Sequence, residues 1–398
     1  MAYNLPSMTV AVRSFAKINL GLYIGAKRAD GFHDLRTVYQ TIALHDIIRV
    51  SLDQRNNARS RKARGSGIEI VCDDPRVPRD ASNTCHRMAE RMIEALGVRG
   101  RITIEIEKKL PVQGGLGGAS SNAVATMLGL EKALERQRAL KRSALKKPLS
   151  GAERLRIAAE VGSDLPLFLV GGTVLGVGRG EEVYPLPDLP PTAMVVVTPD
   201  VGVSTPEAFA EWDELAQREA AGLRPAWTAD HPSRRKSRRL GTPGEGARPD
   251  TASAEPPSAA VPTQVRLTHS GGSDRLFLVG CALSAWLSGL PDAGAPVRAG
   301  SRAGSPLSDL VRTGIENDFE RVVFSQFPEL RDIKRALERA GSRYASLSGS
   351  GSTLYGLFGS SAEAAKAAAR LRKQGLKAVA TRTLTHREYW KKTLGVGL

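Results

Sequence analysis

Hydrophobic and polar positions alternate with a period of two over residues 10–24. Successive side chains of a β-strand point to opposite faces, so this alternation predicts a strand. It also predicts that Lys17 and Asn19, which are polar and two positions apart, lie on the same face of that strand. A turn around residues 30–31, where glycine follows aspartate, separates it from the next strand.

Short segments rich in β-branched and apolar residues predict the remaining strands, at residues 37–42 and on to 47–50, 67–71, 102–107, 173–177, 194–198, 353–358 and 377–381. Apolar periodicity and cap residues predict helices from a cap at Ser82 or Asn83 to Leu96, from near 121 through the 130s, and at about 152–161, 328–340 and 362–373. This mixture indicates an α+β fold in which helices pack on a sheet.

Composition changes in the second half of the chain. Residues 223–264 are dominated by Ala, Pro, Ser, Gly, Thr and Arg, and residues 291–306 by Gly, Ala, Ser and Pro. A helix is predicted between them, at about 273–290. Low-complexity segments cannot bury enough apolar surface to offset the entropy lost on ordering, so we expect a disordered or loosely held insertion.

The net charge of +16 raises the question of a nucleic-acid partner. Much of the excess lies in two polar segments, residues 55–64 and 234–239, which contain no aromatic residues. Basic runs of this kind are typical of solvated loops, so we expect no nucleic-acid partner. The charge would nevertheless help to attract anionic substrates.

Metal sites and membrane segments are not indicated by the sequence. Cys72, Cys85 and Cys281 stand in no metal-ligand spacing, and we expect reduced thiols. The histidines show no paired spacing either, so no metal-ligating residue is predicted. No stretch approaches the roughly 18 consecutive apolar residues that a membrane helix requires, and no secretory signal is recognised. We therefore expect a cytoplasmic protein with no membrane partner.

A glycine-rich segment, PVQGGLGGASS, opens directly into the helix predicted near residue 121. Glycine lets the backbone approach a ligand closely, and the free N–H groups at a helix start attract anions. The segment therefore predicts a phosphate-binding loop, whereas its glycine content alone would also be compatible with a mobile loop. The predicted loop comprises Pro111, Val112, Gln113, Gly114, Gly115, Leu116, Gly117, Gly118, Ala119, Ser120 and Ser121.

Two further residues, Asp164 and Lys17, have a structural and a chemical interpretation. Asp164 stands between two predicted elements, where it would ordinarily be a helix N-cap followed by proline. As a functional group, it would be a carboxylate directed at a substrate hydroxyl and kept ionised by a nearby cation. Lys17 is a candidate for that cation, although a lone strand lysine more often faces solvent.

Taken together and in this order, the motifs resemble those of the GHMP small-molecule kinases. They are FAKINL at residues 15–20, the glycine-rich loop, GSDLP at 162–166 and LSGSGST at 347–353. The segments KRADGFHD at 27–34, VSTPEAF at 203–209 and NDFE at 317–320 are similar to those of one branch of the family, whose substrate is a cytidyl diphosphate sugar alcohol. The resemblance covers roughly residues 10–210 and 310–385.

The resemblance implies two lobes, a ribosomal-protein-S5-like N-terminal domain (1–185) and a ferredoxin-like C-terminal domain (186–398) that includes the insertion at 223–306. It implies ATP and Mg2+ as cofactors, with the ATP phosphates on the glycine-rich loop. Asp164 would take the proton from the substrate hydroxyl, and Lys17 would orient Asp164. The implied substrate contacts are Asn19, Thr205, a cytosine sandwich of Phe32 and Phe209, and His33 at the cytosine edge.

Two positions depart from the family pattern, and two alternatives remain. Phe32 stands where tyrosine is more usual, and Asn122 where aspartate is frequent, so Asn122 is given no metal role. The chain could instead be a GHMP kinase acting on homoserine, mevalonate or a sugar, or a non-catalytic ligand-binding regulator. A monomer or a homodimer is expected.

Overall fold

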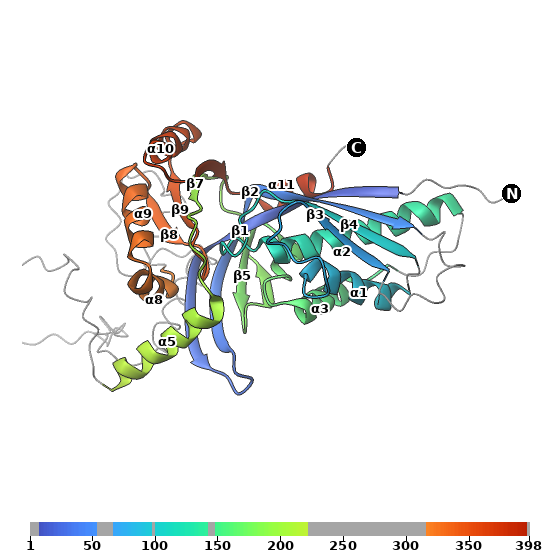
Figure 1. Ribbon diagram of the computed structural model, residues 1–398, viewed down its shortest axis with the longest axis horizontal. Coiled ribbons are helices and arrows are strands. Elements are labelled where there is room, and N and C mark those ends of the chain that lie inside the picture. The colour runs from blue at the N-terminus through green and yellow to red at the C-terminus, as the bar shows by residue number, and fades with distance from the viewer. Residues whose placement is uncertain (1–7, 54–66, 98–99, 142–147, 222–315, 396–398) are drawn as a thin grey trace, which may run out of the picture.

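The computed structural model describes residues 8–53, 67–97, 100–141, 148–221 and 316–395, which form two lobes, each built around a β-sheet (Figure 1). The first lobe contains both ends of the described chain. The second is formed by the chain on either side of the break between residues 221 and 316.

The sheet of the first lobe has the order β3-β4-β2-β5-β6, and β1 pairs with β2 outside this path. Its longest strands, β1 (Met8–Lys27) and β2 (His33–Asp53), are antiparallel and extend as a hairpin toward the second lobe (Figure 1). The shorter strands are β3 (Ile68–Cys72), β4 (Arg101–Glu107), β5 (Thr173–Val177) and β6 (Glu182–Pro185).

Helices cover both faces of this sheet. One face carries α1 (Thr84–Leu96), α2 (Gly118–Lys141) and α3 (Gly151–Val161) (Figure 1), and the short α4 (Leu167–Val170) contacts α2. The last described helix, α11 (His386–Thr393), returns to the first lobe and packs on β1, where Tyr389 contacts the ring of Phe15. The C-terminal helix therefore packs with the N-terminal lobe.

The second lobe has a four-stranded sheet of order β10-β7-β9-β8. Its strands are β7 (Ala193–Val197), β8 (Tyr344–Leu347), β9 (Leu354–Phe358) and β10 (Ala378–Arg382). Its helices are α5 (Thr205–Ala220), α8 (Phe319–Gln326), α9 (Pro328–Arg339) and α10 (Ser361–Lys373).

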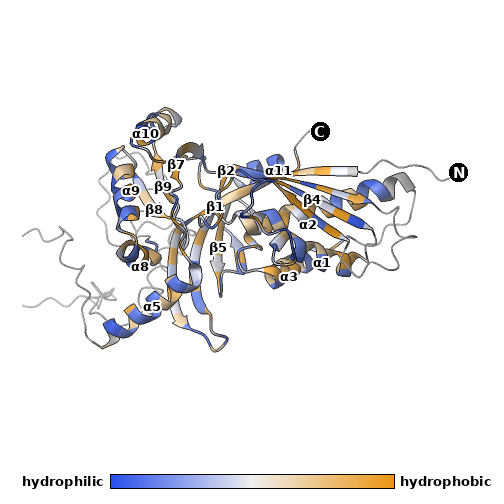
Figure 2. Cartoon of the chain, in the orientation of Figure 1, coloured by the Kyte–Doolittle hydropathy of each residue, from blue (hydrophilic) through white to orange (hydrophobic). Residues whose placement is uncertain are grey.

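The two lobes share a hydrophobic core. All five residues of β7 are buried, because both faces of the second sheet are covered. Val195 and Val197 pack against the helices of their own lobe, whereas Met194 and Val196 pack against Ile18 and other residues of the first lobe. Figure 2 shows orange, hydrophobic positions along the strands of both sheets. This shared core holds the lobes in a fixed relation.

The prediction of an α+β fold is confirmed. Helix α1 has the predicted Asn83 cap, whose side chain accepts from the Cys85 N–H, and it ends at Gly97. The strand predicted over residues 37–42 and on to 47–50 is β2, which is longer at both ends than predicted. Helix α2 starts three residues earlier than predicted. Strand β6 and helices α5, α8 and α11 were not predicted.

Several predictions lie outside the described residues. These are the basic segments, the low-complexity stretches with the helix at about 273–290, and Cys281. Cys72 and Cys85 are buried free thiols, and burial raises the pKa of Cys85 to about 12. Among the described helices, none has the length and apolarity needed to cross a membrane.

Candidate active site

Lys17 and Asn19 lie on the same face of β1, as the alternation predicted. Lys17 Nζ donates to Asn19 Oδ1 at 2.7 Å, and Asn19 Nδ2 donates to Thr37 Oγ1 at 2.7 Å. The Thr37 hydroxyl donates in turn to the Gly21 carbonyl at 2.8 Å. Lys17 is 4% exposed, so it is not a solvent-facing strand lysine. Because Asn19 is also buried and bonded at both ends of its amide, its geometry favours holding Lys17 over contacting a substrate.

Asp164 lies opposite this lysine and does not cap a helix. The N-cap of α4 is Pro166, and no side-chain cap bond is present there. Instead, Asp164 Oδ2 lies 3.4 Å from Lys17 Nζ, and Oδ1 accepts from the Tyr39 hydroxyl at 3.1 Å. The Asp164 side chain is 36% exposed. The arrangement is therefore a carboxylate that is paired on its inner side and open to solvent on the other.

The predicted phosphate loop leads into α2, which starts at Gly118. The first turn of this helix carries no acidic side chain, so its positive end is uncompensated. Ser121 is buried, where its hydroxyl bonds Ser14 Oγ at 2.6 Å and the Gly118 carbonyl at 3.1 Å. Ser121 thus fixes the helix start from inside, and the surface available to an anion is mainly backbone.

The loop is clamped by the second glycine-rich segment, residues 348–353 of the other lobe. Thr353 N–H donates to the Gly114 carbonyl at 3.2 Å, and Ser348 Oγ donates to the Gly115 carbonyl at 3.0 Å. Gly115 has φ +78°, and a Cβ on it would overlap the Ser348 carbonyl oxygen. Only glycine permits so close an approach of two backbones.

Both glycine loops also enclose Lys17. A Cβ on Gly117 would lie 3.0 Å from Lys17 Cγ, and one on Gly349 would lie 3.4 Å from Lys17 Nζ. The Lys17 N–H donates to the Leu116 carbonyl at 3.0 Å. The ammonium group is therefore located where the two loops meet.

A second buried charge, Asp46 on β2, supports the loop from behind. Its carboxylate is 0% exposed and accepts from Lys108 Nζ at 2.7 Å, from the N–H groups of Lys109 and Leu110 at 2.7 Å each, and from Asn122 Nδ2 at 3.0 Å. Lys108 Nζ would lie 3.3 Å from a Cβ on Gly118, which places a cation beside the start of α2. Sequence reasoning missed both charges, since a single Asp inside a strand pattern carries no signal of its partners.

The residues expected to bind the cytidyl group meet where the β1–β2 hairpin approaches α5. His33 stacks on Phe209 with ring centroids 5.0 Å apart, and its Nε2 lies 2.7 Å from Asp213 Oδ1. Phe32 is 51% exposed, with the Arg179 guanidinium 5.1 Å from its ring centroid. His33 therefore covers the Phe209 face on which the sandwich was expected. The sandwich itself remains a prediction.

Asp213 is a functional candidate that sequence reasoning missed, because α5 was not predicted. It accepts from Lys27 Nζ at 2.6 Å as well as from His33. Burial raises the pKa of this carboxyl, but hydrogen bonds from Lys27 and His33 outweigh burial and lower the pKa below its usual value. Thr205 begins α5, and its hydroxyl bonds Ser350 Oγ at 2.7 Å, so this end of α5 is joined to the second glycine loop.

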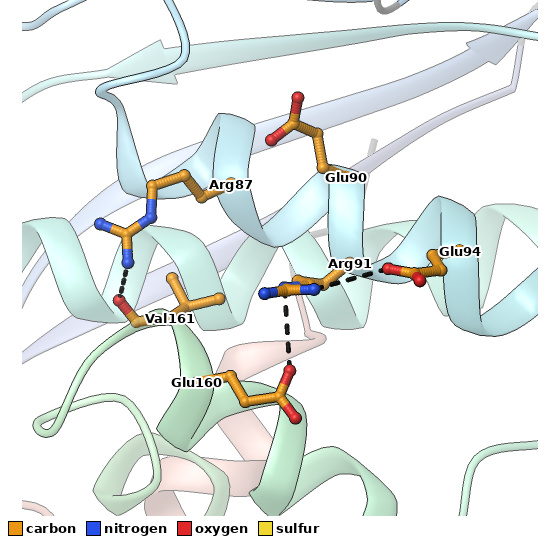
Figure 3. A pocket seen from close by; sticks show the side chains of 6 residues that line it. All are labelled: Arg87, Glu90, Arg91, Glu94, Glu160 and Val161. Carbon is orange, nitrogen blue, oxygen red and sulfur yellow. Dashed lines mark hydrogen bonds and ion pairs between the residues drawn. The ribbon is translucent and has the colours of Figure 1, made fainter.

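A surface hollow of about 210 Å³ lies between α1 and the end of α3 (Figure 3). Its lining alternates in charge, and Arg91 is paired with Glu94 at 3.5 Å and with Glu160 at 3.7 Å. It contains neither Lys17, Asp164 nor the glycine loops. Within the described parts of the chain, no group of three or more His, Cys, Asp or Glu side chains could hold a metal ion.

Comparison with known proteins gives a consistent result. The family described as "GHMP kinases N terminal domain" matches residues 83–172, and "GHMP kinases C terminal" matches residues 302–377. A protein of Solibacter usitatus named 4-diphosphocytidyl-2-C-methyl-D-erythritol kinase is 33% identical over 347 residues, covering 87% of this chain and 80% of the relative. A protein of Chlorobium limicola with the same name is 29% identical over 371 residues, covering 93% and 96%.

A solved structure entitled 4-(cytidine 5'-diphospho)-2C-methyl-D-erythritol kinase superimposes with a TM-score of 0.56 at 24% identity. The match covers 94% of this chain and 99% of that one. At 24% identity, this superposition supports the fold alone.

The contact between the glycine loops predicts that Gly115→Ala is strongly destabilising. The added methyl group would overlap the Ser348 carbonyl and hold alanine at positive φ, which together should cost roughly 3 kcal/mol of unfolding free energy. Gly375→Ala is the matched control, because Gly375 has φ +84° with nothing within 4 Å of the added Cβ. Chemical denaturation measures the unfolding free energy of both variants. Equal losses would show that the loop contact adds nothing beyond backbone strain.

Proposed function

The chain belongs to the GHMP kinase family, and from that premise we propose that it transfers the γ-phosphoryl group of ATP to the C2 hydroxyl of 4-diphosphocytidyl-2-C-methyl-D-erythritol. This reaction is a step of the non-mevalonate route to isoprenoid precursors. The proposal is supported by relatives that carry this substrate in their names and match nearly the whole chain. The DGFH segment at residues 30–33 and Phe209 support it further.

One observation carries the mechanism, namely the ion pair of Lys17 and Asp164 at the junction of the glycine loops. Phosphoryl transfer needs positioned charge more than covalent help from the protein. The open side of Asp164 is available to an incoming hydroxyl, while Lys17 holds its Oδ2 from the inside at 3.4 Å. A regulator without activity would have no use for a carboxylate held in this way.

The glycine-rich loop at residues 111–121 is proposed to hold the ATP phosphates. Backbone N–H groups at the start of α2, the absence of acidic side chains in its first turn, and the nearby Lys108 ammonium all suit an anion. Mg2+ would be bound in part by the phosphates themselves, as is common for this ion.

In the proposed step, Asp164 accepts the proton of the C2 hydroxyl as that oxygen forms its bond to the γ-phosphorus. The bond from the γ-phosphorus to the bridging oxygen breaks, and ADP leaves. The Lys17 ammonium orients Asp164 and stabilises the negative charge that develops beside it. Asn19 and Thr37 keep Lys17 in place from the side away from the substrate.

The hairpin tip and α5 are proposed to recognise the cytidyl group. An exposed Phe32 can stack on a base, and His33 can present a ring nitrogen to its edge. For a base to be sandwiched by Phe209, the His33 ring would have to leave the face it now covers. Asp213 would then determine how far His33 can move.

The first prediction from this proposed function concerns the substrate and the base. With ATP and Mg2+, ADP release is expected with the cytidyl substrate and not with homoserine, mevalonate or galactose. Asp164→Asn should lower kcat by at least about a thousandfold, because the general base is lost, while the dissociation constant of the substrate changes little. Near-normal turnover by this variant would rule out Asp164 as the base, and turnover with another alcohol alone would rule out the cytidyl pocket.

The second prediction concerns Asp213. Asp213→Ala removes the partner of His33 and Lys27, and should raise KM for the cytidyl substrate about tenfold without changing KM for ATP. Asp332→Ala is the control, since Asp332 makes only an exposed pair with Arg335 at 3.7 Å. Steady-state kinetics with each substrate varied in turn distinguishes the two. An unchanged KM would remove Asp213 from the binding site.

A further inference from the structure

Tyr39 is a buried residue of β2 whose hydroxyl contacts the proposed base. It is 2% exposed, and it pairs in register with Asn19 of β1 on one side and Val174 of β5 on the other. Its hydroxyl donates to Asp164 Oδ1 at 3.1 Å. Its ring lies 5.5 Å from Lys17 Nζ. Tyr39 is therefore in contact with both charged groups of the site.

The tyrosine ring occupies a slot that two glycines leave open. A Cβ on Gly176 of β5 would overlap the ring, and a Cβ on Gly180, where φ is +98°, would lie 2.6 Å from the Tyr39 hydroxyl oxygen. The turn that contains Gly180 is fixed by a bond from the Leu35 N–H to the Gly178 carbonyl at 2.6 Å. The backbone of the β5–β6 turn thus determines where the Tyr39 hydroxyl points.

The environment keeps this hydroxyl protonated. Burial, and then the charge of Asp164, raise the pKa of Tyr39 well above its ordinary value. The charged groups that face the pair are Lys17 from β1 and Glu181 from the β5–β6 turn, and Glu181 is itself paired with Arg179 at 2.9 Å. Tyr39 is consequently a neutral donor to the carboxylate at every pH at which the enzyme would work.

We propose that Tyr39 is a positioning residue for Asp164. It holds Oδ1 while Lys17 holds Oδ2, and together they fix the carboxylate with its open side toward the substrate hydroxyl. This inference rests on the proposed function, because it requires that Asp164 be the base.

Tyr39→Phe tests the proposal by removing one oxygen and keeping the ring in its slot. We expect kcat to fall about tenfold, with KM for both substrates within a factor of two. A purely structural role would lower stability and leave the kcat of the folded variant unchanged.

Tyr344→Phe is the matched control, because it removes a buried hydroxyl that donates to the Leu20 carbonyl at 3.2 Å. It should cost similar stability and leave kcat within a factor of two. Gly180→Ala gives an independent test, since its methyl group would displace the Tyr39 hydroxyl and lower kcat in the same way. Gly341→Ala, with φ +99° and nothing within 4 Å, controls for backbone strain.

The outcomes distinguish the role of Tyr39 from the role of Asp164 as the base. An unchanged kcat in both Tyr39→Phe and Gly180→Ala overturns the role of Tyr39, even if Asp164→Asn is inactive. Retained turnover in Asp164→Asn overturns the base assignment and with it the premise. A lowered kcat with unchanged KM in both variants, and normal kcat in Tyr344→Phe and Gly341→Ala, supports the proposal.

Discussion

The contact between two glycine loops from different lobes is the constraint on which the site depends. Gly115 lies against the backbone of residues 348–351, and the Ser348 hydroxyl and Thr353 N–H bond the first loop directly. A side chain on Gly115 would separate the backbones, and the enclosed Lys17 would lose its surroundings. The need for glycine in both loops thus follows from one packing requirement, which also fixes the proposed phosphate loop relative to Asp164, the proposed base. The shared core of Met194, Val196 and the inner face of β1 keeps the lobes at the distance this contact demands.

A buried ammonium is costly unless its hydrogen bonds and charge are matched. At Lys17 the structure does this with a series of polar groups that runs from Thr37 through Asn19 to Lys17 and then to Asp164. Thr37 and Asn19 use their hydrogen bonds on one another and on Lys17. Within this series, Asp164 is therefore the charged group that remains open to a substrate. The pair of Asp46 and Lys108, which lies behind the proposed phosphate loop, is matched in the same way. Two backbone N–H groups donate the further hydrogen bonds that the buried Asp46 carboxylate needs. Positioning in this enzyme is therefore achieved by saturated polar networks inside an apolar sheet.

Local patterns in the sequence were sufficient for some parts of this arrangement and not for others. Alternation placed Lys17 and Asn19 on one face, and the glycines before a helix indicated the loop that leads into α2, because both signals lie within a few residues. The Tyr39–Asp164 bond joins residues 125 positions apart and depends on strand register, which no local pattern encodes. The role of Asp46 was missed because its partners come from residues 108–110 and 122. Asp213 was missed because polar residues on α5 obscured its helical periodicity.

The described parts of the second lobe that precede and follow residues 222–315 are held in place by their own contacts. Asn317 pairs with Leu22 of β1 and donates to the carbonyls of Leu347 and Gly349, so it holds the second glycine loop in place. Glu219 of α5 forms an ion pair with Arg321 of α8, and Arg321 also lies 5.3 Å from the ring centroid of Trp212. Helices α5 and α8 are therefore held together by their own side chains, and through Asn317 and Leu22 the second glycine loop is tied to the strand that carries Lys17.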